Sequence, residues 1–263
     1  DTFCLSADRI KEKITPRTKA IILVHLFGHP ADMDPIMELA RVNNIAVIED
    51  VAQAPFASYK GRPLGSIGDV GVFSLNSNKH IHTGEDGIVT TNQAELAERV
   101  SLIRNHAEAV VGDRGVKNIV NMVGFNFRMN EIEAAIGLCQ LKKGPSLVNQ
   151  RCKNVAYLDT KLGGMPGIAV QRCERDIRHV YYVHPVKFDA NKLNISRETF
   201  VAALKAELPE TRMKEGAGPL IGAGYVRPIY LEPMFQSKIA FGENGCPFNH
   251  PYYSGVVNYE RGI

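Results

Sequence analysis

The chain has 263 residues, of which 44% are hydrophobic and 22% are charged, and its formal net charge at pH 7 is +3. These proportions are close to those of globular proteins and argue against a disordered chain or a coiled coil. No apolar run reaches the roughly 18 residues of a membrane-spanning helix, and the basic residues form no block, so we expect neither a membrane nor nucleic acid as a partner.

The N-terminal half of the sequence alternates between strand and helix patterns. The predicted strands are 20–26, 45–48, 70–74 and 87–91, and the predicted helices are 34–42 and 93–104. The run 20–26 is apolar throughout, which predicts a strand that is covered on both faces. Strands and helices joined by short crossovers predict an α/β fold with a mostly parallel sheet.

Two helical patterns follow in the middle of the chain. Asn130 can cap a helix over 130–142, and Glu133, three residues later, completes a capping-box pattern. A second helical pattern extends over 146–162. We therefore predict two consecutive helices at the end of the first domain.

Glycines and a proline over 163–167 mark a domain boundary. Beyond this boundary we predict a strand over 180–183 and a helix over 196–208. The expected organisation is a large α/β domain over residues 1–163 followed by a smaller α+β domain over residues 164–263.

Asp50 lies at the carboxyl end of a predicted buried strand. In open α/β sheets, ligands bind in the crevice outside these strand ends. The Asp50 carboxylate is therefore either a polar strand terminus or a group that faces a ligand, and Gln53 adds a hydrogen-bonding group from the same loop.

Lys79 lies between two predicted strands, five residues after Ser74 and just before the glycine-containing turn 83–87. A lysine in this place is either a solvated cation or a desolvated Schiff-base lysine, whose neutral amine acts as a nucleophile and then as a proton shuttle. The second reading implies pyridoxal phosphate, whose ring nitrogen an aspartate keeps protonated.

The five cysteines lie far apart and form no Cys-x-x-Cys pair, so we expect reduced thiols in a cytoplasmic protein, without a disulfide scaffold or a metal site. His25 and His29 are four residues apart but straddle a predicted strand end, which does not suit a zinc pair. The chain begins at Asp1 without a leader and ends at Ile263 without a closing signal, so we expect a piece of a longer protein.

Several short motifs, taken in their order along the chain, resemble the DegT/StrS-type sugar aminotransferases, which are fold-type I enzymes dependent on pyridoxal 5'-phosphate. The motifs are Ile48-Glu49-Asp50-Val51-Ala52-Gln53-Ala54, Gly65-Ser66-Ile67-Gly68-Asp69, Phe73-Ser74, Asn78-Lys79, Thr83-Gly84-Glu85-Asp86-Gly87, Arg104-Asn105-His106 and the run 124–135. A looser similarity continues through 225–230 and 246–249. The resemblance implies a large domain of the aspartate aminotransferase type, from which this chain lacks the N-terminal part and the extreme C-terminus.

The resemblance also implies roles for individual residues. Lys79 would form the internal aldimine with the cofactor, and Asp50 would pair with its pyridinium nitrogen. Gln53 would lie near the phenolic oxygen, and Ser74 would bind the phosphate. Asn126 would reach the cofactor phosphate of the neighbouring subunit, which implies a homodimer with shared active sites.

Two further residues have open readings. Arg128 either contacts substrate or anchors the turn before the helix at residue 130. His106 either interacts with the end of a helix or contacts substrate.

Asp86 stands where the family usually has glycine, and an aspartate tolerates the left-handed conformation that a turn there requires.

The function that the resemblance implies is transfer of an amino group from a donor, expected to be glutamate, to a nucleotide-linked keto-sugar. Such a reaction belongs to amino-sugar, polysaccharide or secondary-metabolite biosynthesis. One alternative is a dehydratase on the same scaffold, because some relatives replace the Schiff-base lysine with histidine. Another is a non-catalytic regulatory relative. Lys79 stands in the matching place, which favours transamination.

Overall fold

The computed structural model of the chain describes residues 2–107, 122–171, 173–208, 221–223, 227–242 and 245–249. Contacts divide the chain into two compact units. The first comprises Asp1–Ile195 with Arg212–Gly218, and the second comprises Ser196–Thr211 with Pro219–Ile263. The division of the complete protein at residue 163 stays a prediction.

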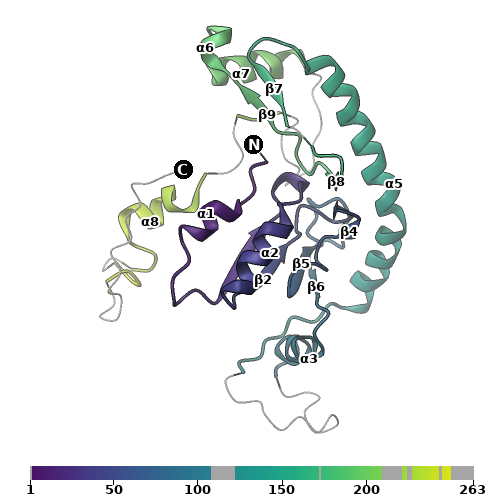
Figure 1. The fold of residues 1–263 in the computed structure, drawn as a ribbon, viewed down its shortest axis with the longest axis vertical. Coiled ribbons are helices and arrows are strands. Elements are labelled where there is room, and N and C mark those ends of the chain that lie inside the picture. Colours follow the sequence, from purple (N-terminus) through teal and green to yellow (C-terminus); the bar gives the residue numbers. More distant parts are fainter. Residues whose placement is uncertain are drawn as a thin grey trace. The chain divides into compact units, whose positions relative to one another are not determined.

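A four-stranded sheet forms the centre of the first unit (Figure 1). Its strands are β1 (Ala20–Val24), β2 (Ala46–Asp50), β5 (Val70–Ser74) and β6 (Gly87–Thr90), in the order β1-β2-β5-β6. The strands β1, β2 and β5 are parallel, and β6 is antiparallel to β5. The predicted α/β fold with a mostly parallel sheet is therefore confirmed.

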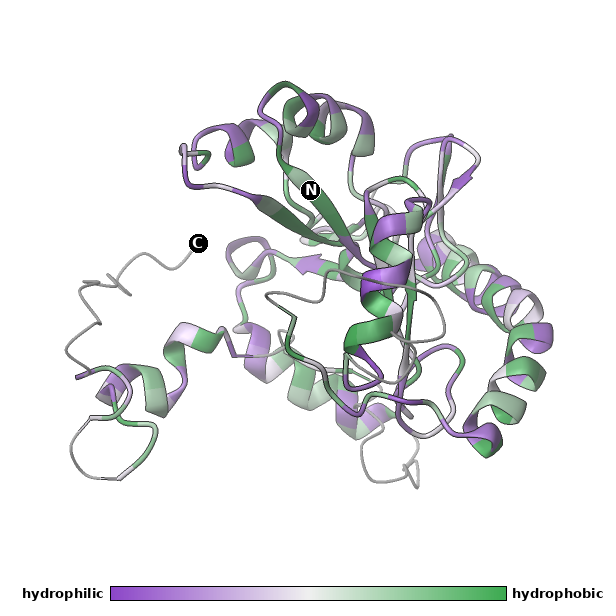
Figure 2. Cartoon of the chain, turned by 90° about the horizontal axis from the view of Figure 1, so that it is seen from below, coloured by the Kyte–Doolittle hydropathy of each residue, from purple (hydrophilic) through white to green (hydrophobic). Residues whose placement is uncertain are grey.

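The helix α2 (Met33–Val42) connects β1 to β2 and lies across one face of the sheet (Figure 1). Its buried side chains recur at helical spacing, so that Ile36 and Ala40 face the sheet. They pack with Leu23 of β1 and Val47 of β2 in one hydrophobic core. Figure 2 shows polar and apolar residues side by side along the helices, as expected of elements with one buried face.

The strand β1 is covered on one face only. Its residues alternate between buried and exposed, and Ile22 is 63% exposed while Leu23 is completely buried. The prediction that the apolar run 20–26 is covered on both faces is therefore wrong for the described residues, because α2 and the core lie on one side. The run also ends earlier as a strand, since a 3-10 turn η1 (Leu26–Gly28) follows β1.

The long helix α5 (Glu131–Leu162) begins as the sequence predicts. The Asn130 side chain accepts a hydrogen bond from the Glu133 N–H over 2.9 Å, and the Glu133 carboxylate accepts one from the Asn130 N–H over 3.4 Å. Both halves of the capping box are thus present.

The two helices predicted in this region are in fact one continuous helix that passes through Pro145. A proline in a helix removes one backbone hydrogen bond, but Pro145 lies on the exposed side, where water can reach the unpaired carbonyl. On the buried side, Gly144 lies directly against the Phe56 ring and Val148 is completely buried in the core. Packing of this buried side therefore stabilises the helix through Pro145, where local preference would end it.

Two small sheets complete the first unit. One is formed by β3 (Ser58–Tyr59), β4 (Arg62–Pro63) and β8 (Ile177–Arg178), and the other by β7 (Ile168–Val170) and β9 (Val186–Phe188). The helix α3 (Ala94–Ile103) follows β6, and the short helices α1 (Ala7–Lys11) and α6 (Ala190–Leu193) lie near the two ends of the unit's sequence.

The strand predicted over 180–183 is wrong, because this segment is irregular and bends between β8 and β9. Tyr181 adopts the left-handed region with a φ of 50°, which interrupts any ladder. The Val180 N–H donates instead to the carbonyl of Gly28 over 3.1 Å. Local strand propensity is here overridden by a contact with a distant segment.

The described residues of the second unit include α7 (Arg197–Glu207), η2 (Ile229–Leu231) and α8 (Pro233–Ser237). The helix predicted over 196–208 is confirmed, and its cap is Ser196, whose hydroxyl accepts a hydrogen bond from the Thr199 N–H over 3.0 Å. Part of the predicted motif at 225–230 lies outside the described residues.

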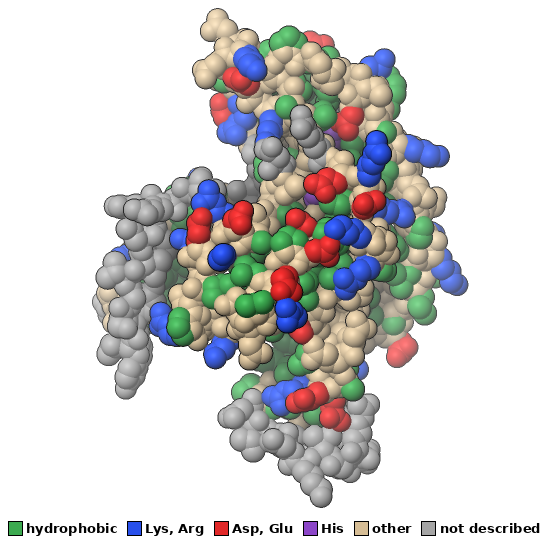
Figure 3. Space-filling view, in the orientation of Figure 1, with side chains coloured by type: hydrophobic (Ala, Val, Ile, Leu, Met, Phe, Trp, Pro, Cys, Tyr) green, Lys and Arg blue, Asp and Glu red, His purple; other side chains and the backbone are tan. Residues whose placement is uncertain are grey.

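Across the described ranges, no helix combines the length and apolar character needed to cross a membrane. Acidic and basic side chains are interspersed on the face drawn in Figure 3.

Candidate active site

Three neighbouring strands end at one edge of the sheet. Val24 of β1 and Val72 of β5 are both register partners of Asp50, the last residue of β2. Beyond these strands, the His25 N–H donates to the Asp50 carbonyl over 3.1 Å, and the Val51 N–H donates to the Val72 carbonyl over 2.8 Å. The carboxyl edge of the parallel strands, where ligands bind in such folds, is therefore held together just beyond Asp50.

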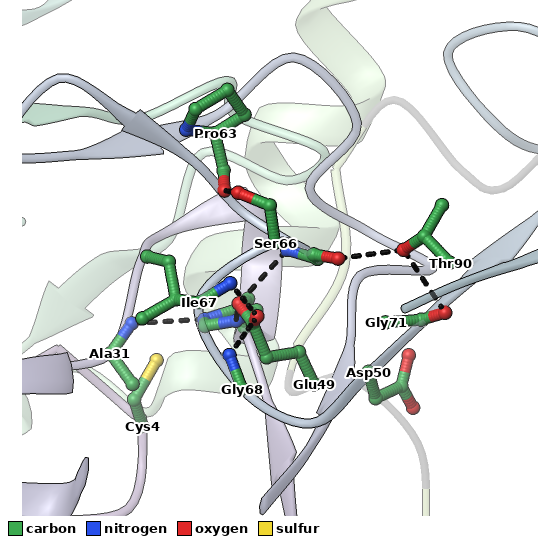
Figure 4. A network of polar contacts seen from close by, with 12 residues as sticks. Cys4, Ala31, Glu49, Asp50, Pro63, Ser66, Ile67, Gly68, Gly71 and Thr90 are labelled. Atoms are coloured by element: carbon green, nitrogen blue, oxygen red, sulfur yellow. Dashed lines mark hydrogen bonds and ion pairs between the residues drawn. The ribbon is translucent and has the colours of Figure 1, made fainter. Parts of the chain in front are cut away.

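Asp50 and Glu49 face opposite sides of β2, as neighbouring residues of a strand do. The Asp50 side chain is half-buried, and its Oδ1 accepts a hydrogen bond from the Ala52 N–H over 3.0 Å. In Figure 4 the Asp50 carboxylate lies beside a network of polar contacts and outside it. Asp50 thus presents a carboxylate at the strand edge, as predicted.

The centre of that network is Glu49, which belongs to a recognised motif but for which the sequence predicted no role. It is completely buried, and its Oε1 accepts hydrogen bonds from the N–H groups of Ile67 and Gly68, both over 2.7 Å. Its Oε2 accepts from the Gly65 N–H over 2.9 Å and lies 3.1 Å from His25 Nε2. Burial alone would raise the pKa of Glu49, but the donors of His25, Gly65 and Gly68 together lower it below its usual range.

Lys79 lies in the loop that connects β5 to β6. Its N–H donates to the Asn76 carbonyl over 2.9 Å, and the Asn76 N–H donates to the Ser74 hydroxyl over 3.3 Å. The amine of Lys79 lies 4.9 Å from the centre of the Tyr182 ring. Ser74 thus ends a strand that neighbours the strand of Asp50, and Lys79 lies in the loop directly after it.

Asp86 in the same loop has a φ of 115°, which confirms that a turn here needs a residue with positive φ.

Gln53 contacts the backbone at Phe27 and Gly28, just beyond the carboxyl end of β1. Its Oε1 accepts a hydrogen bond from the Phe27 N–H over 2.7 Å. A Cβ at Gly28 would lie 2.9 Å from both the Gln53 carbonyl and the Tyr182 nitrogen, and Gly28 has a φ of 91°. Only glycine allows this close approach, which brings the Gln53 loop against the segment that carries Tyr182.

His80, next to Lys79, connects the loop of Lys79 to the segment that carries Tyr182. Its Nε2–H donates to the Val180 carbonyl over 3.0 Å. Burial lowers the pKa of His80 to about 4, so the ring is neutral at physiological pH. Sequence reasoning missed Tyr182, because a tyrosine in a predicted strand carried no signal of a contact with Lys79.

Asn126, Arg128 and His106 form a second group near the end of α3. Asn126 pairs with Asn105 in an isolated bridge, and Arg128 Nη1 donates to the Asn105 side-chain oxygen over 2.6 Å. The His106 N–H donates to the Phe125 carbonyl over 2.9 Å. All three predicted residues are exposed, so the structure brings them together at the surface.

The side chains of the strand edge have the chemistry that pyridoxal phosphate requires. A carboxylate such as Asp50 can keep a pyridine nitrogen protonated, a primary amine such as Lys79 can condense with an aldehyde, and the Ser74 hydroxyl can bind a phosphate. In the described part of the chain, no group of three or more His, Cys, Asp and Glu side chains could hold a metal ion.

Comparison with known proteins agrees with this chemistry. Residues 1–259 match the DegT/DnrJ/EryC1/StrS aminotransferase family. The GDP-perosamine synthase of Caulobacter vibrioides is 39% identical over 263 residues, which are 97% of this chain and 67% of that protein. The chain spans 63% to 67% of the length of four curated relatives that it matches, this synthase among them.

Solved structures show the same likeness. The crystal structure of S. venezuelae DesV matches with a TM-score of 0.73 and 31% identity, over 92% of this chain and 59% of that chain. The E. coli GDP-4-keto-6-deoxy-D-mannose-3-dehydratase with bound hydrated PLP matches with a TM-score of 0.69 and 27% identity, over 78% of this chain and 56% of that chain.

Proposed function

The chain belongs to the DegT/DnrJ/EryC1/StrS aminotransferase family, and we propose that the full-length protein uses pyridoxal 5'-phosphate to transfer an amino group to a nucleotide-linked keto-sugar. The observation that carries this proposal is the strand pairing: Ser74 ends β5, Lys79 follows in the next loop, and β5 pairs with β2, which ends at Asp50. An amine, a hydroxyl and a carboxylate at one sheet edge are the groups that such a cofactor needs.

When bound, pyridoxal phosphate supplies an aldehyde for amines and an aromatic ring that withdraws electrons from the reacting carbon. Asp50 holds the proton on the ring nitrogen, because an ionised carboxylate accepts a strong hydrogen bond from a cationic N–H. Lys79 carries a proton between two carbons, because its neutral amine is a base and its protonated form is an acid.

Gln53 and Ser74 position the cofactor. The hydrogen bond from the Phe27 N–H fixes the orientation of the Gln53 side chain. In this orientation Gln53 would lie near the phenolic oxygen of the bound cofactor. The Ser74 hydroxyl, at the end of β5, would donate to the cofactor phosphate.

The protein acts as a homodimer in which Asn126 reaches the cofactor phosphate of the other subunit. Support comes from the surface around Asn126, where the neighbouring rings of Phe125 and Phe127 are 47% and 65% exposed and stack at 4.9 Å. An exposed pair of aromatic rings marks a surface suited to a partner chain. Arg128 and His106, on the same surface, are the candidate substrate contacts, and Arg128 also anchors the turn before α5 through its hydrogen bond to Asn105.

The amino donor is glutamate, and the protein works in the cytoplasm. A dehydratase on this scaffold is not favoured, because Lys79 provides the amine that shuttles the proton, and relatives at 39% and 33% identity are GDP-perosamine synthases. The same lysine argues against a non-catalytic regulatory relative.

The test uses the full-length protein, purified with pyridoxal phosphate. Addition of glutamate should bleach the yellow absorbance, and a subsequent keto-sugar nucleotide should restore it and gain an amino group that mass spectrometry detects. A panel of nucleotide-linked keto-sugars identifies the substrate. A protein that loses water from the sugar without aminating it would be a dehydratase, and a protein without any turnover would contradict the proposal.

A further inference from the structure

We propose that Tyr182 is a positioning residue that holds the amine of Lys79 for its reaction with the cofactor. The inference rests on the proposed function. It starts from the distance of 4.9 Å between Lys79 Nζ and the centre of the Tyr182 ring. A lysine ammonium within about 6 Å of an aromatic ring centre is attracted by the negative face of the ring.

The segment that carries Tyr182 is fixed although it is not a strand. The Val180 N–H donates to the Gly28 carbonyl over 3.1 Å, and the Val183 N–H donates to the Phe27 carbonyl over 3.4 Å. Arg151 Nη1, from α5, donates to the Tyr181 carbonyl over 3.2 Å. Hydrogen bonds therefore hold the backbone on both sides of Tyr182, and we call this fixed segment, from which the Tyr182 ring projects, the platform.

The loop of Lys79 is fixed to the same platform by the next residue. His80 Nε2–H donates to the Val180 carbonyl over 3.0 Å, and the ring centres of His80 and Tyr182 are 5.8 Å apart. Burial keeps His80 neutral at physiological pH, because its pKa falls to about 4. His80 thus anchors the loop without placing a second positive charge beside the amine of Lys79.

These contacts give Tyr182 a specific task. A lysine side chain has many rotamers, and a reaction is faster when the reacting amine already lies in the required place. The Tyr182 ring, which belongs to a different segment from the loop of Lys79, favours the Lys79 rotamers that keep the amine beside it. The contact holds the protonated amine in place before the reaction. The amine then loses a proton to solvent and attacks the cofactor aldehyde, and water leaves as the C=N bond forms.

The experiment uses the full-length protein without cofactor and compares wild type, Tyr182→Leu and Tyr182→Phe. The rate of C=N bond formation is followed by visible absorbance after mixing with pyridoxal phosphate. The dissociation constant of pyridoxamine phosphate is measured separately, because this compound has no aldehyde and binds without a bond to Lys79. We expect Tyr182→Leu to slow bond formation about fivefold and to leave the dissociation constant unchanged, whereas Tyr182→Phe keeps the ring and both values.

Equal losses in bond formation and in pyridoxamine phosphate affinity would overturn the inference, because they would indicate general damage to the site. Bond formation at the wild-type rate in Tyr182→Leu would overturn it as well. If Tyr182→Leu does not fold, Tyr182→Met provides a flexible side chain of similar size for the same comparison. Wild-type protein that binds neither compound would contradict the proposed function itself.

Discussion

His25 and Glu49 form a completely buried pair in which Nε2 of the ring lies 3.1 Å from the Glu49 carboxylate. The Ala31 N–H donates to His25 Nδ1 over 3.1 Å, so the ring hydrogen is on Nε2 and donates to Glu49. The His25 ring and three backbone N–H groups therefore surround the carboxylate. The pair joins the ends of β1 and β2 directly beside Asp50, and it links the proposed catalytic edge to the core.

Glu49→Gln should destabilise the protein by about 1–3 kcal/mol, because the amide NH2 group faces backbone N–H groups that have lost their acceptor. Denaturant unfolding measures this change. Glu174→Gln, at an exposed position, is the matched control and should change the free energy of unfolding by less than about 0.5 kcal/mol. Similar stability of the two variants would mean that the buried carboxylate is not ionised.

The same carboxylate gives a pH dependence. Because the pKa of Glu49 is lowered in the folded state, its contribution to stability is complete above the unfolded value and is lost as the pH falls through the folded value. The stability difference between wild type and Glu49→Gln should therefore shrink in acid. A difference that does not vary with pH would contradict this.

His179 should make the protein sensitive to mild acid. Burial lowers its pKa to about 3, while its Nδ1 accepts from the Tyr181 N–H over 3.0 Å. Below the unfolded pKa of about 6.5, the unfolded chain binds a proton that the folded chain does not, so stability falls by up to about 1.36 kcal/mol per pH unit until pH 3 is approached.

His179→Asn removes this titration and retains an acceptor for the Tyr181 N–H. The free energy of unfolding of this variant, measured between pH 7 and pH 4, should fall less steeply than that of wild type. A comparison at pH 8, where neither state binds the proton, isolates the structural cost of the substitution. Parallel curves for the two proteins would show that His179 is protonated in the folded state.

Lys79→Ala should abolish both the yellow absorbance and transamination in the full-length protein while the fold is retained. The loss of the proton shuttle alone should reduce turnover by about 10² to 10⁴. Lys153→Ala, which removes an exposed lysine of α5, should keep absorbance and turnover. Circular dichroism checks the fold, and a Lys79→Ala protein that still turns over would contradict the assignment.

Asp50→Asn should weaken cofactor binding by about 1.5–3 kcal/mol, because an amide does not hold the ring nitrogen protonated. The loss in kcat should be larger, since charge spreads onto the ring only in the transition state. Fluorescence titration and steady-state kinetics measure the two effects. The asparagine oxygen can still accept the Ala52 N–H. Wild-type kcat would mean that Asp50 is only a strand terminus.

Asn126→Ala and Lys79→Ala should each be nearly inactive as full-length homodimers. After subunit exchange the mixed dimer should regain activity, because one of its two sites has both residues intact. Native mass spectrometry confirms that the mixed dimer forms. If the mixed dimer is no more active than its parents, Asn126 serves its own loop, in which it pairs with Asn105.

The sequence by itself determined the central strands β1, β2, β5 and β6, the helices α2, α3 and α7, and the strand-end position of Asp50. These features follow from local periodicity, since a buried strand is a short apolar run and the residue that ends it is polar. The capping box of Asn130 and Glu133 was readable for the same reason, because both partners lie within one helical turn. The ordered motifs around Lys79 were equally local, and they supported the family that the comparison then showed.

Only the tertiary structure decided how these local pieces meet. His80 and Val180, which join the loop of Lys79 to the platform of Tyr182, are 100 residues apart in the sequence. The turn at Tyr181 and the unbroken helix through Pro145 both contradict local preference, because contacts with Gly28 and with the core outweigh it. Glu49 had the polarity of a surface residue, and it is buried because three backbone N–H groups and His25 converge on it. Such convergence depends on distant segments, and a single sequence read along one strand does not contain it.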